Sequence, residues 1–181
     1  MKIYFAPLKF SNKDVTVRLN KELSGIFLVH IEIIHINIDL SESYSSERKQ
    51  YHSTKIIESA LSKTDFADGK VLILTEADLY VPVLTFVFGE AQLGGKLSIV
   101  SVCRLHEEFY TGHTNEELFY ERTKKEVLHE LGHTFGLLHC FDWDCVMHSS
   151  NSIEEVDIKG NTYCKHCFDD IKNQIPLHFK E

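Results

Sequence analysis

The sequence predicts an α/β (α+β) protein with a mixed sheet of about five strands. Strand-like and helix-like stretches alternate through the first half of the chain, and a long helical pattern with two histidines four residues apart follows. The remaining residues have little periodicity but contain four of the five cysteines. A chain of 181 residues is long enough for one good core. We therefore expect a single domain over 1–181, with an N-terminal subdomain (1–138) and a C-terminal subdomain (139–181).

Strands are expected where β-branched and apolar residues run together. The predicted strands are Lys2 to Leu8, Phe27 to Leu40 with a bulge, Val71 to Leu74, Thr85 to Ala91, and Lys96 to Arg104. The run Val71 to Leu74 suits an interior parallel strand. Gly94-Gly95 predicts a hairpin, so one strand of the sheet should be antiparallel. Two histidines within the second strand, His30 and His35, have no partner at ligand spacing and are expected to be solvent-facing or satisfied core residues.

Helices are expected where apolar residues recur every three or four positions. The first helix should begin near Ser11 and Asp14, end before Gly25, and bury Val15, Leu19 and Leu23. The second follows a polar loop at 41–50, ends before Asp68, and carries Ile56, Ile57, Ala60 and Leu61. A capping box of Thr114 and Glu117 opens a long helix from about Asn115 to Phe135. A short terminal helix should be closed by Pro176 and carry Phe168, Ile171 and Ile175.

The long helix carries the first candidate site. His129 and His133 are four residues apart and therefore project from one face of the helix, where they can share one metal ion. The face opposite them should pack on the sheet; it carries Tyr120, Val127, Leu131, Phe135 and Leu138. His139 can join the pair only if the helix stops first, and Gly136 is the residue type that ends helices. Three imidazoles favour Zn²⁺ and leave a coordination position open for water. Glu130 lies beside the pair, where a proton-handling carboxylate is needed.

Four cysteines form the second candidate site. Cys140, Cys145, Cys164 and Cys167 have the short, long, short spacing of a tetrahedral Cys₄ zinc site. His148 or His166 could replace one thiolate, because imidazole is also a zinc ligand. The remaining cysteine, Cys103, is expected to be a buried apolar residue, and the alternative is a regulatory thiol that caps the zinc.

The stretch from His129 to Cys167 resembles the metzincin clan of zinc peptidases and, because of its cysteines and Met147, the archaemetzincin family within it. That resemblance implies a peptidase with two Zn²⁺ ions, one catalytic and one structural, and with Glu130 as general base. It places Met147 in a tight turn beneath the catalytic metal. It also implies an extended peptide substrate paired with the strand Thr85 to Ala91. Ser149 occupies the position where some metzincins have a tyrosine.

The remaining features narrow the partners and the location. A formal charge of −8 argues against nucleic acid and against a membrane surface. The N-terminus lacks a sustained apolar run, so we expect no signal peptide or anchor and a cytoplasmic protein, whose cysteines would bind metal. A monomer is expected. The alternative to a peptidase is a zinc-stabilised protein that binds peptides with little or no cleavage.

Overall fold

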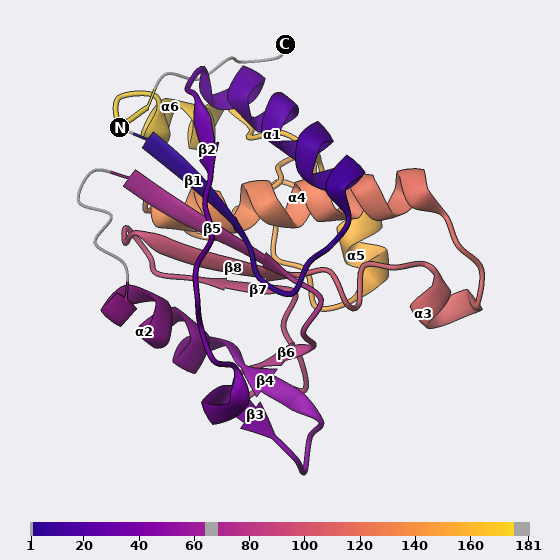
Figure 1. Ribbon diagram of the computed structural model, residues 1–181. Helices are drawn as coiled ribbons and strands as arrows, with labels where there is room; N and C mark the ends of the chain where they lie inside the picture. Colours follow the sequence, from indigo (N-terminus) through magenta and orange to yellow (C-terminus); the bar gives the residue numbers. More distant parts are fainter. Residues whose placement is uncertain (1, 64–68, 176–181) are drawn as a thin grey trace.

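The computed structural model, drawn in Figure 1, describes residues 2–63 and 69–175. Five strands form a mixed sheet in the order β2-β1-β5-β8-β7, in which β7 alone runs antiparallel to its neighbour. The strands are β1 (Lys2–Pro7), β2 (Ile31–Ile33), β5 (Gly69–Thr75), β7 (Gly89–Ala91) and β8 (Leu97–Ser101). This confirms the predicted mixed sheet, the interior parallel strand and the antiparallel hairpin.

The two faces of the sheet bury different helices because side chains alternate along each strand. Leu72 and Leu74 of β5 pack with α1 (Lys13–Phe27) and α4 (Glu116–Thr134). Val71 and Ile73 pack on the opposite face with α2 (Ser53–Lys63). The long helix α4 thus lies on one face of the sheet, as its apolar positions predict.

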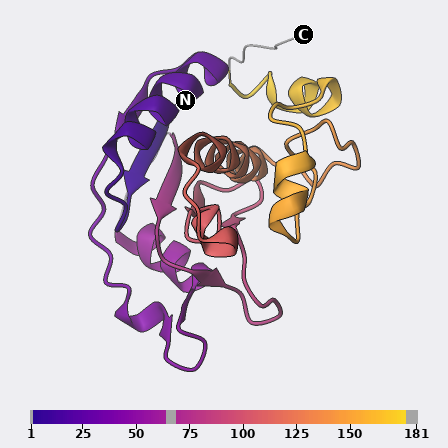
Figure 2. The same cartoon turned by 90° about the vertical axis from the view of Figure 1, so that its right-hand side faces the viewer.

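The molecule is layered around α4. Figure 2 looks along this helix and places the sheet on one side of it, with α5 (Ile153–Ile158) and α6 (Lys165–Ile171) on the other. We call residues 139–175 the C-terminal segment. Because this segment covers the helix face turned away from the sheet, α4 is buried on nearly every side. Leu138 is an exception to the predicted core face, since the chain has already turned there and leaves this side chain 68% exposed.

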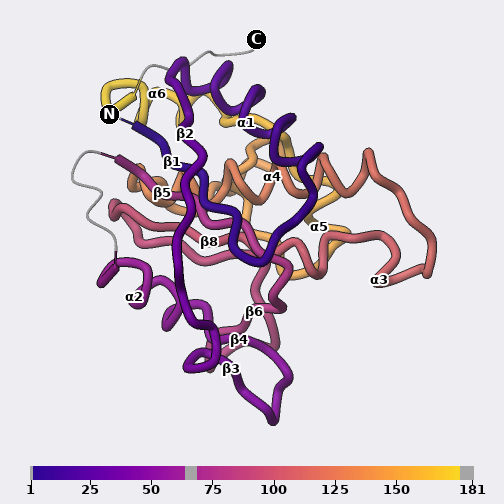
Figure 3. Tube along the Cα trace, in the orientation of Figure 1, coloured from indigo at the N-terminus to yellow at the C-terminus, as the bar shows by residue number. Residues whose placement is uncertain are grey.

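The predicted strand from Phe27 to Leu40 is mostly wrong. The helix α1 continues through Gly25 and buries Phe27 completely, and only Ile31–Ile33 then pairs with β1. Residues 34–40 follow as a segment without strand pairing that descends beside the sheet, visible in Figure 3 between β2 and β3. Its buried side chains Ile38 and Leu40 join the α2 core, which explains the apolar pattern without a strand.

The region between α1 and β8 contains a second sheet that the sequence did not predict. The three-stranded sheet has the order β3-β4-β6 and consists of β3 (Tyr44–Ser45), β4 (Gln50–His52) and β6 (Leu79–Tyr80). The expected polar loop at 41–50 thus includes a 3₁₀ turn, η1 (Ser41–Ser43), and part of this sheet. The strand expected from Thr85 is shortened to β7, because Val87 bonds instead to Leu79 in the small sheet (N–O 2.9 Å).

Several helix boundaries also differ from prediction. Asparagine side chains cap α1 and α4: Asn12 accepts a hydrogen bond from the amide of Val15, and Asn115 accepts one from the amide of Leu118. Each cap lies one residue after the predicted one, Ser11 or Thr114. Two short helices, α3 (Glu108–Thr111) and α5, were not predicted. The terminal helix α6 stops at Ile171, and the predicted stops at Asp68 and Pro176 lie outside the described residues. Within the described residues, no helix is long and apolar enough to cross a membrane.

Candidate metal centres and active site

The first two histidines are held with their Nε2 atoms facing each other. His129 Nδ1 bonds to the carbonyl oxygen of Val146 (2.9 Å), and His133 Nδ1 bonds to that of Leu137 (2.7 Å). A carbonyl only accepts, so both Nδ1 atoms carry the proton and both Nε2 atoms present lone pairs. The two Nε2 atoms are 3.1 Å apart. Two zinc–nitrogen bonds of about 2.1 Å at a tetrahedral angle separate their nitrogens by about 3.4 Å, so the pair fits a zinc ion.

The third histidine joins them because the helix ends at the predicted place. Gly136 has φ +90°, and the amide of Leu137 bonds back to the carbonyl of Gly132 (3.1 Å). The chain reverses, and the ring of His139 lies 5.3 Å from that of His129 and 5.0 Å from that of His133 (centroid distances). One ring nitrogen from each of the three histidines lies within 4.8 Å of the others.

Burial keeps these imidazoles in the form that binds metal. Removal from water lowers the pKa of His129 strongly and the pKa values of His133 and His139 to a lesser degree. The positive charge of Lys159 acts in the same direction on all three histidines. Neutral imidazole is the ligand form, so the site requires no proton release from these rings before a metal binds.

Glu130 is buried beside the histidines and lines the same cleft of about 640 Å³. Burial raises its pKa well above the usual range, and the neighbouring Glu126 carboxylate adds to this shift. A glycine in β7 makes room for the Glu130 side chain: a Cβ added to Gly89 would lie 2.6 Å from Glu130 Oε1. The edge strand and the helix therefore approach closely only because residue 89 has no side chain.

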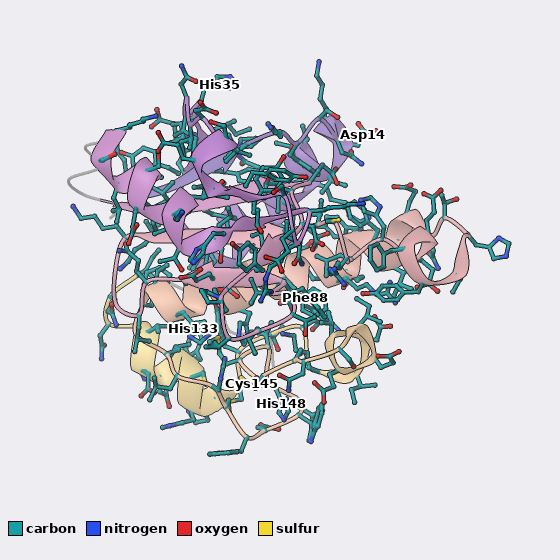
Figure 4. All side chains as sticks on the ribbon, turned by 90° about the horizontal axis from the view of Figure 1, so that it is seen from below. Asp14, His35, Phe88, His133, Cys145 and His148 are labelled. Atoms are coloured by element: carbon teal, nitrogen blue, oxygen red, sulfur yellow. The ribbon has the colours of Figure 1, made fainter. Side chains whose placement is uncertain are left out.

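Residues 84–91 and Leu93 line one side of the cleft, and Ser149, Ser150 and Asn151 also line it. Figure 4 places His133 between Phe88 on the sheet side and Cys145 and His148 in the C-terminal segment, with His35 far away at the outer edge. His30 and His35 are both exposed, which confirms that they face solvent.

The floor of the site joins α4 to the C-terminal segment. Met147 is completely buried against the helix, where a Cβ added to Gly132 would lie 2.4 Å from its sulfur. Beside it, the ammonium of Lys159 forms an ion pair with Glu126 (Nζ–Oε1 2.7 Å), and these side chains are 0% and 4% exposed. The sequence did not reveal this pair, because its two members are 33 residues apart and belong to no motif.

The four cysteines form a second cluster. The Sγ atoms of Cys140 and Cys164 are 3.9 Å apart, and those of Cys145 and Cys167 are 3.7 Å apart. Zinc–sulfur bonds of about 2.3 Å in a tetrahedron separate sulfurs by about 3.8 Å, so this cluster also fits a zinc ion. The pKa of Cys145 is lowered to about 5 by the hydrogen bond from Cys167 and by backbone amides of Cys164 and Met147. A stabilised thiolate is the ligand form.

Neither alternative histidine belongs to this cluster among the described residues. His148 stacks on Trp143 at 3.7 Å and its Nδ1 contacts the Ser149 carbonyl oxygen (2.9 Å). The side chain of His166 is 83% exposed. Cys103 is half-buried, less than predicted, and burial raises the pKa of its thiol.

The structure places a mixed sheet beside a helix that carries a histidine pair, and a third histidine follows a glycine turn. This is the arrangement of the metzincin class, which the sequence resembles. The profile of Peptidase family M54 matches residues 12–173. The chain is 37% identical to the archaemetzincin of Methanocaldococcus jannaschii over 96% of this chain and 94% of that protein. It therefore belongs to the archaemetzincin family of metallopeptidases.

Solved structures agree with this assignment. The archaemetzincin of Methanopyrus kandleri superposes with a TM-score of 0.83 at 34% identity, covering 96% of this chain and 94% of that one. A zinc-dependent peptidase of Methanocorpusculum labreanum also superposes with a TM-score of 0.83, at 28% identity and with coverage of 93% and 99%. Both the five-stranded sheet and the four-cysteine cluster are thus features of a known family fold.

Proposed function

We propose that the protein hydrolyses peptide bonds with a zinc ion held by His129, His133 and His139, and that Cys140, Cys145, Cys164 and Cys167 hold a second, structural zinc ion. The observation that carries this proposal is the pair of facing Nε2 atoms 3.1 Å apart, with a buried carboxyl group next to them in an open cleft. Lone pairs at this separation repel unless a cation lies between them. The zinc-dependent peptidase among the structural relatives supports the choice of metal.

Glu130 is the proposed catalytic residue. Zinc bound by three imidazoles would polarise the scissile carbonyl and lower the pKa of a water molecule to about 7. The charge of a bound metal ion would favour the ionised form of Glu130 and so oppose the effect of burial on its pKa. The Glu130 carboxylate then takes the proton from the attacking water and delivers it to the nitrogen of the leaving amine. Close packing against Gly89 holds the Glu130 side chain in position, and Glu130 is itself buried.

The substrate is proposed to bind as an extended peptide along β7. This strand is the edge of the sheet, and residues on and around it line the cleft. An edge strand presents unpaired backbone groups that can form a ladder with another extended chain. Recognition through the backbone sets the direction of the peptide, while side chains around the cleft set its sequence preference. A monomeric state and a cytoplasmic location remain predictions from the sequence.

The test is hydrolysis of a mixed-sequence peptide library by the zinc-loaded protein and by its Glu130→Gln variant. Glutamine keeps the size of the side chain but cannot accept the proton, so we expect turnover to fall by about 10³-fold while both zinc ions remain bound. Equal turnover by the two proteins would contradict the role of Glu130. Peptide binding without cleavage by the wild type would instead support the non-cleaving alternative.

A further inference from the structure

A second cavity adjoins the catalytic cleft. It has a volume of about 630 Å³, close to that of the cleft, and both cavities are lined by Leu138 and His139. We call it the side pocket. The turn after α4, residues 135–137, forms one wall, and residues on and just after α6 form another. Phe141 and two cysteines of the proposed zinc site, Cys140 and Cys167, complete the lining. The two cavities therefore meet at one short ridge, which contains the third histidine.

The rim of the side pocket is apolar and uncovered. The side chain of Leu138 is 68% exposed and that of Phe141 is 99% exposed. Phe141 follows Cys140 directly, so the cysteine cluster fixes the backbone beneath it while its ring makes almost no packing contact of its own. Burying such a side chain against an apolar partner removes it from water and stabilises the complex. An apolar partner would gain this stabilisation at the rim.

One carboxylate lines the side pocket. Asp170 lines it with a 55% exposed side chain, and its ion pair with the exposed His166 is long (3.8 Å). The amide nitrogen of Gln174 is already used by the carbonyl oxygen of Phe135 (2.9 Å). Two further carboxylates, Asp142 and Asp144, follow Phe141 in the sequence and are exposed. A lysine or arginine would therefore find opposite charge here, on a chain whose net charge is −8.

We propose that the side pocket binds the part of the substrate that extends beyond the catalytic cleft, and that it selects an apolar or aromatic side chain next to a lysine or arginine. This inference rests on the proposed peptidase function, because continuity with the cleft is what identifies the occupant as the same peptide. An extended chain advances about 3.3 Å per residue, so a peptide above His139 needs only a few residues to pass from one cavity into the other.

Binding can be tested separately from cleavage. The probe is the capped dipeptide acetyl-Phe-Lys-amide, titrated into the zinc-loaded Glu130→Gln protein and followed by backbone-amide NMR shifts. Acetyl-Phe-Glu-amide and acetyl-Ser-Lys-amide are the controls, and each lacks one of the two recognised features. We expect shifts at residues 137–141 and 166–170, with a Kd about tenfold lower than for either control dipeptide.

Matched variants assign those shifts to the side pocket. Phe141→Ser and Asp170→Asn should each weaken acetyl-Phe-Lys-amide binding by about fivefold to tenfold, with two zinc ions retained. Phe109→Ser removes a different phenylalanine, which is half-exposed on α3, and Asp169→Asn removes a neighbouring carboxylate that pairs with Lys165 and Lys172. Neither control variant should change the Kd.

Three results would overturn the proposal. Shifts confined to residues 84–93 would place the dipeptide in the catalytic cleft alone. Binding that appears only after removal of residues 176–181, which include Leu177, Phe179 and Lys180, would make the chain's own tail the occupant. Signal broadening that increases with protein concentration and hides the dipeptide effect would make a second copy the occupant.

Kinetics distinguish a failure of the side pocket from a failure of the peptidase proposal. Peptides with Phe-Lys placed at successive distances from the cleavage site should include one whose KM rises about tenfold in Asp170→Asn while kcat is unchanged. Hydrolysis with no such peptide would overturn the side-pocket proposal and leave the peptidase proposal intact. Dipeptide binding at the side pocket without hydrolysis of any peptide would support a peptide-binding pocket and contradict the peptidase proposal.

Discussion

The helix α4 and the C-terminal segment contribute to the same cleft but are ordered in different ways. The helix is held by its core, because its apolar side chains pack on the sheet and its hydrogen bonds are internal. The C-terminal segment has only two short helices, and its chain is gathered around four cysteine sulfurs. A segment of this size cannot bury enough apolar surface to fold alone, whereas a metal cross-link can order it.

This difference implies a dependence in one direction. The C-terminal segment supplies His139 itself, the Val146 carbonyl that orients His129, and Met147 beneath the site. The helix supplies none of the four cysteines. We therefore propose that the histidine site needs the cysteine site, while the cysteine site forms without the histidine site. The proposed division at residues 138 and 139 follows the same boundary.

The largest expected effect comes from breaking the ion pair that joins the two regions. Lys159→Met leaves the Glu126 carboxylate buried without its partner, which should lower the free energy of unfolding by about 3–5 kcal/mol. Denaturant unfolding of the zinc-loaded protein measures this. The double variant Lys159→Met/Glu126→Leu should recover most of the loss. Lys165→Met, which removes a lysine whose side chain is 81% exposed, is the control and should leave the unfolding midpoint unchanged.

The second-largest effect is expected where the edge strand β7 approaches the helix α4. Gly89→Ala places a methyl group against the carboxyl of Glu130, which must move. A displacement of about 1 Å at a reacting group costs about 10²-fold in rate, so kcat should fall by that factor while both zinc ions and KM are retained. Gly25→Ala, at a position with no atom within 4 Å of the added Cβ among the described residues, is the matched control. Unchanged kcat in Gly89→Ala would show that Glu130 is not positioned by this contact.

A smaller effect is expected at the junction of the two regions. Gly136 has φ +90°, and an added Cβ would meet no described atom within 4 Å, so a substitution there acts through the backbone alone. Gly136→Val should weaken zinc binding at the histidine site by about tenfold, since a β-branched residue resists positive φ by about 1–2 kcal/mol. Gly136→Asn should weaken it less. Competition with a zinc chelator measures the zinc affinity of both variants. Wild-type zinc affinity in Gly136→Val would show that the turn at Gly136 is not what brings His139 to the other two histidines.

The sequence predicted the parts of the protein that follow a local rule. The histidine spacing, the glycine stop and the cysteine spacing each reflect geometry within a few residues, and the structure brings those residues together as expected. The strand predicted at 27–40 is confirmed only at Ile31–Ile33, because Phe27 belongs to α1 and the later apolar residues are buried in the α2 core without forming a strand. Gly89, Lys159 and the Val146 carbonyl were missed, because their importance comes from contacts between residues distant in the chain.

The central claim is the one-way dependence between the two sites, and a single comparison tests it most directly: zinc stoichiometry and peptide hydrolysis measured side by side in Cys164→Ser and His129→Ala. We predict that Cys164→Ser loses both tightly bound zinc ions and its turnover, because His139 and the Val146 carbonyl that orients His129 are released together. His129→Ala should lose turnover but keep one zinc ion at the cysteines. A Cys164→Ser protein that keeps a tightly bound catalytic zinc ion and full turnover would contradict the account.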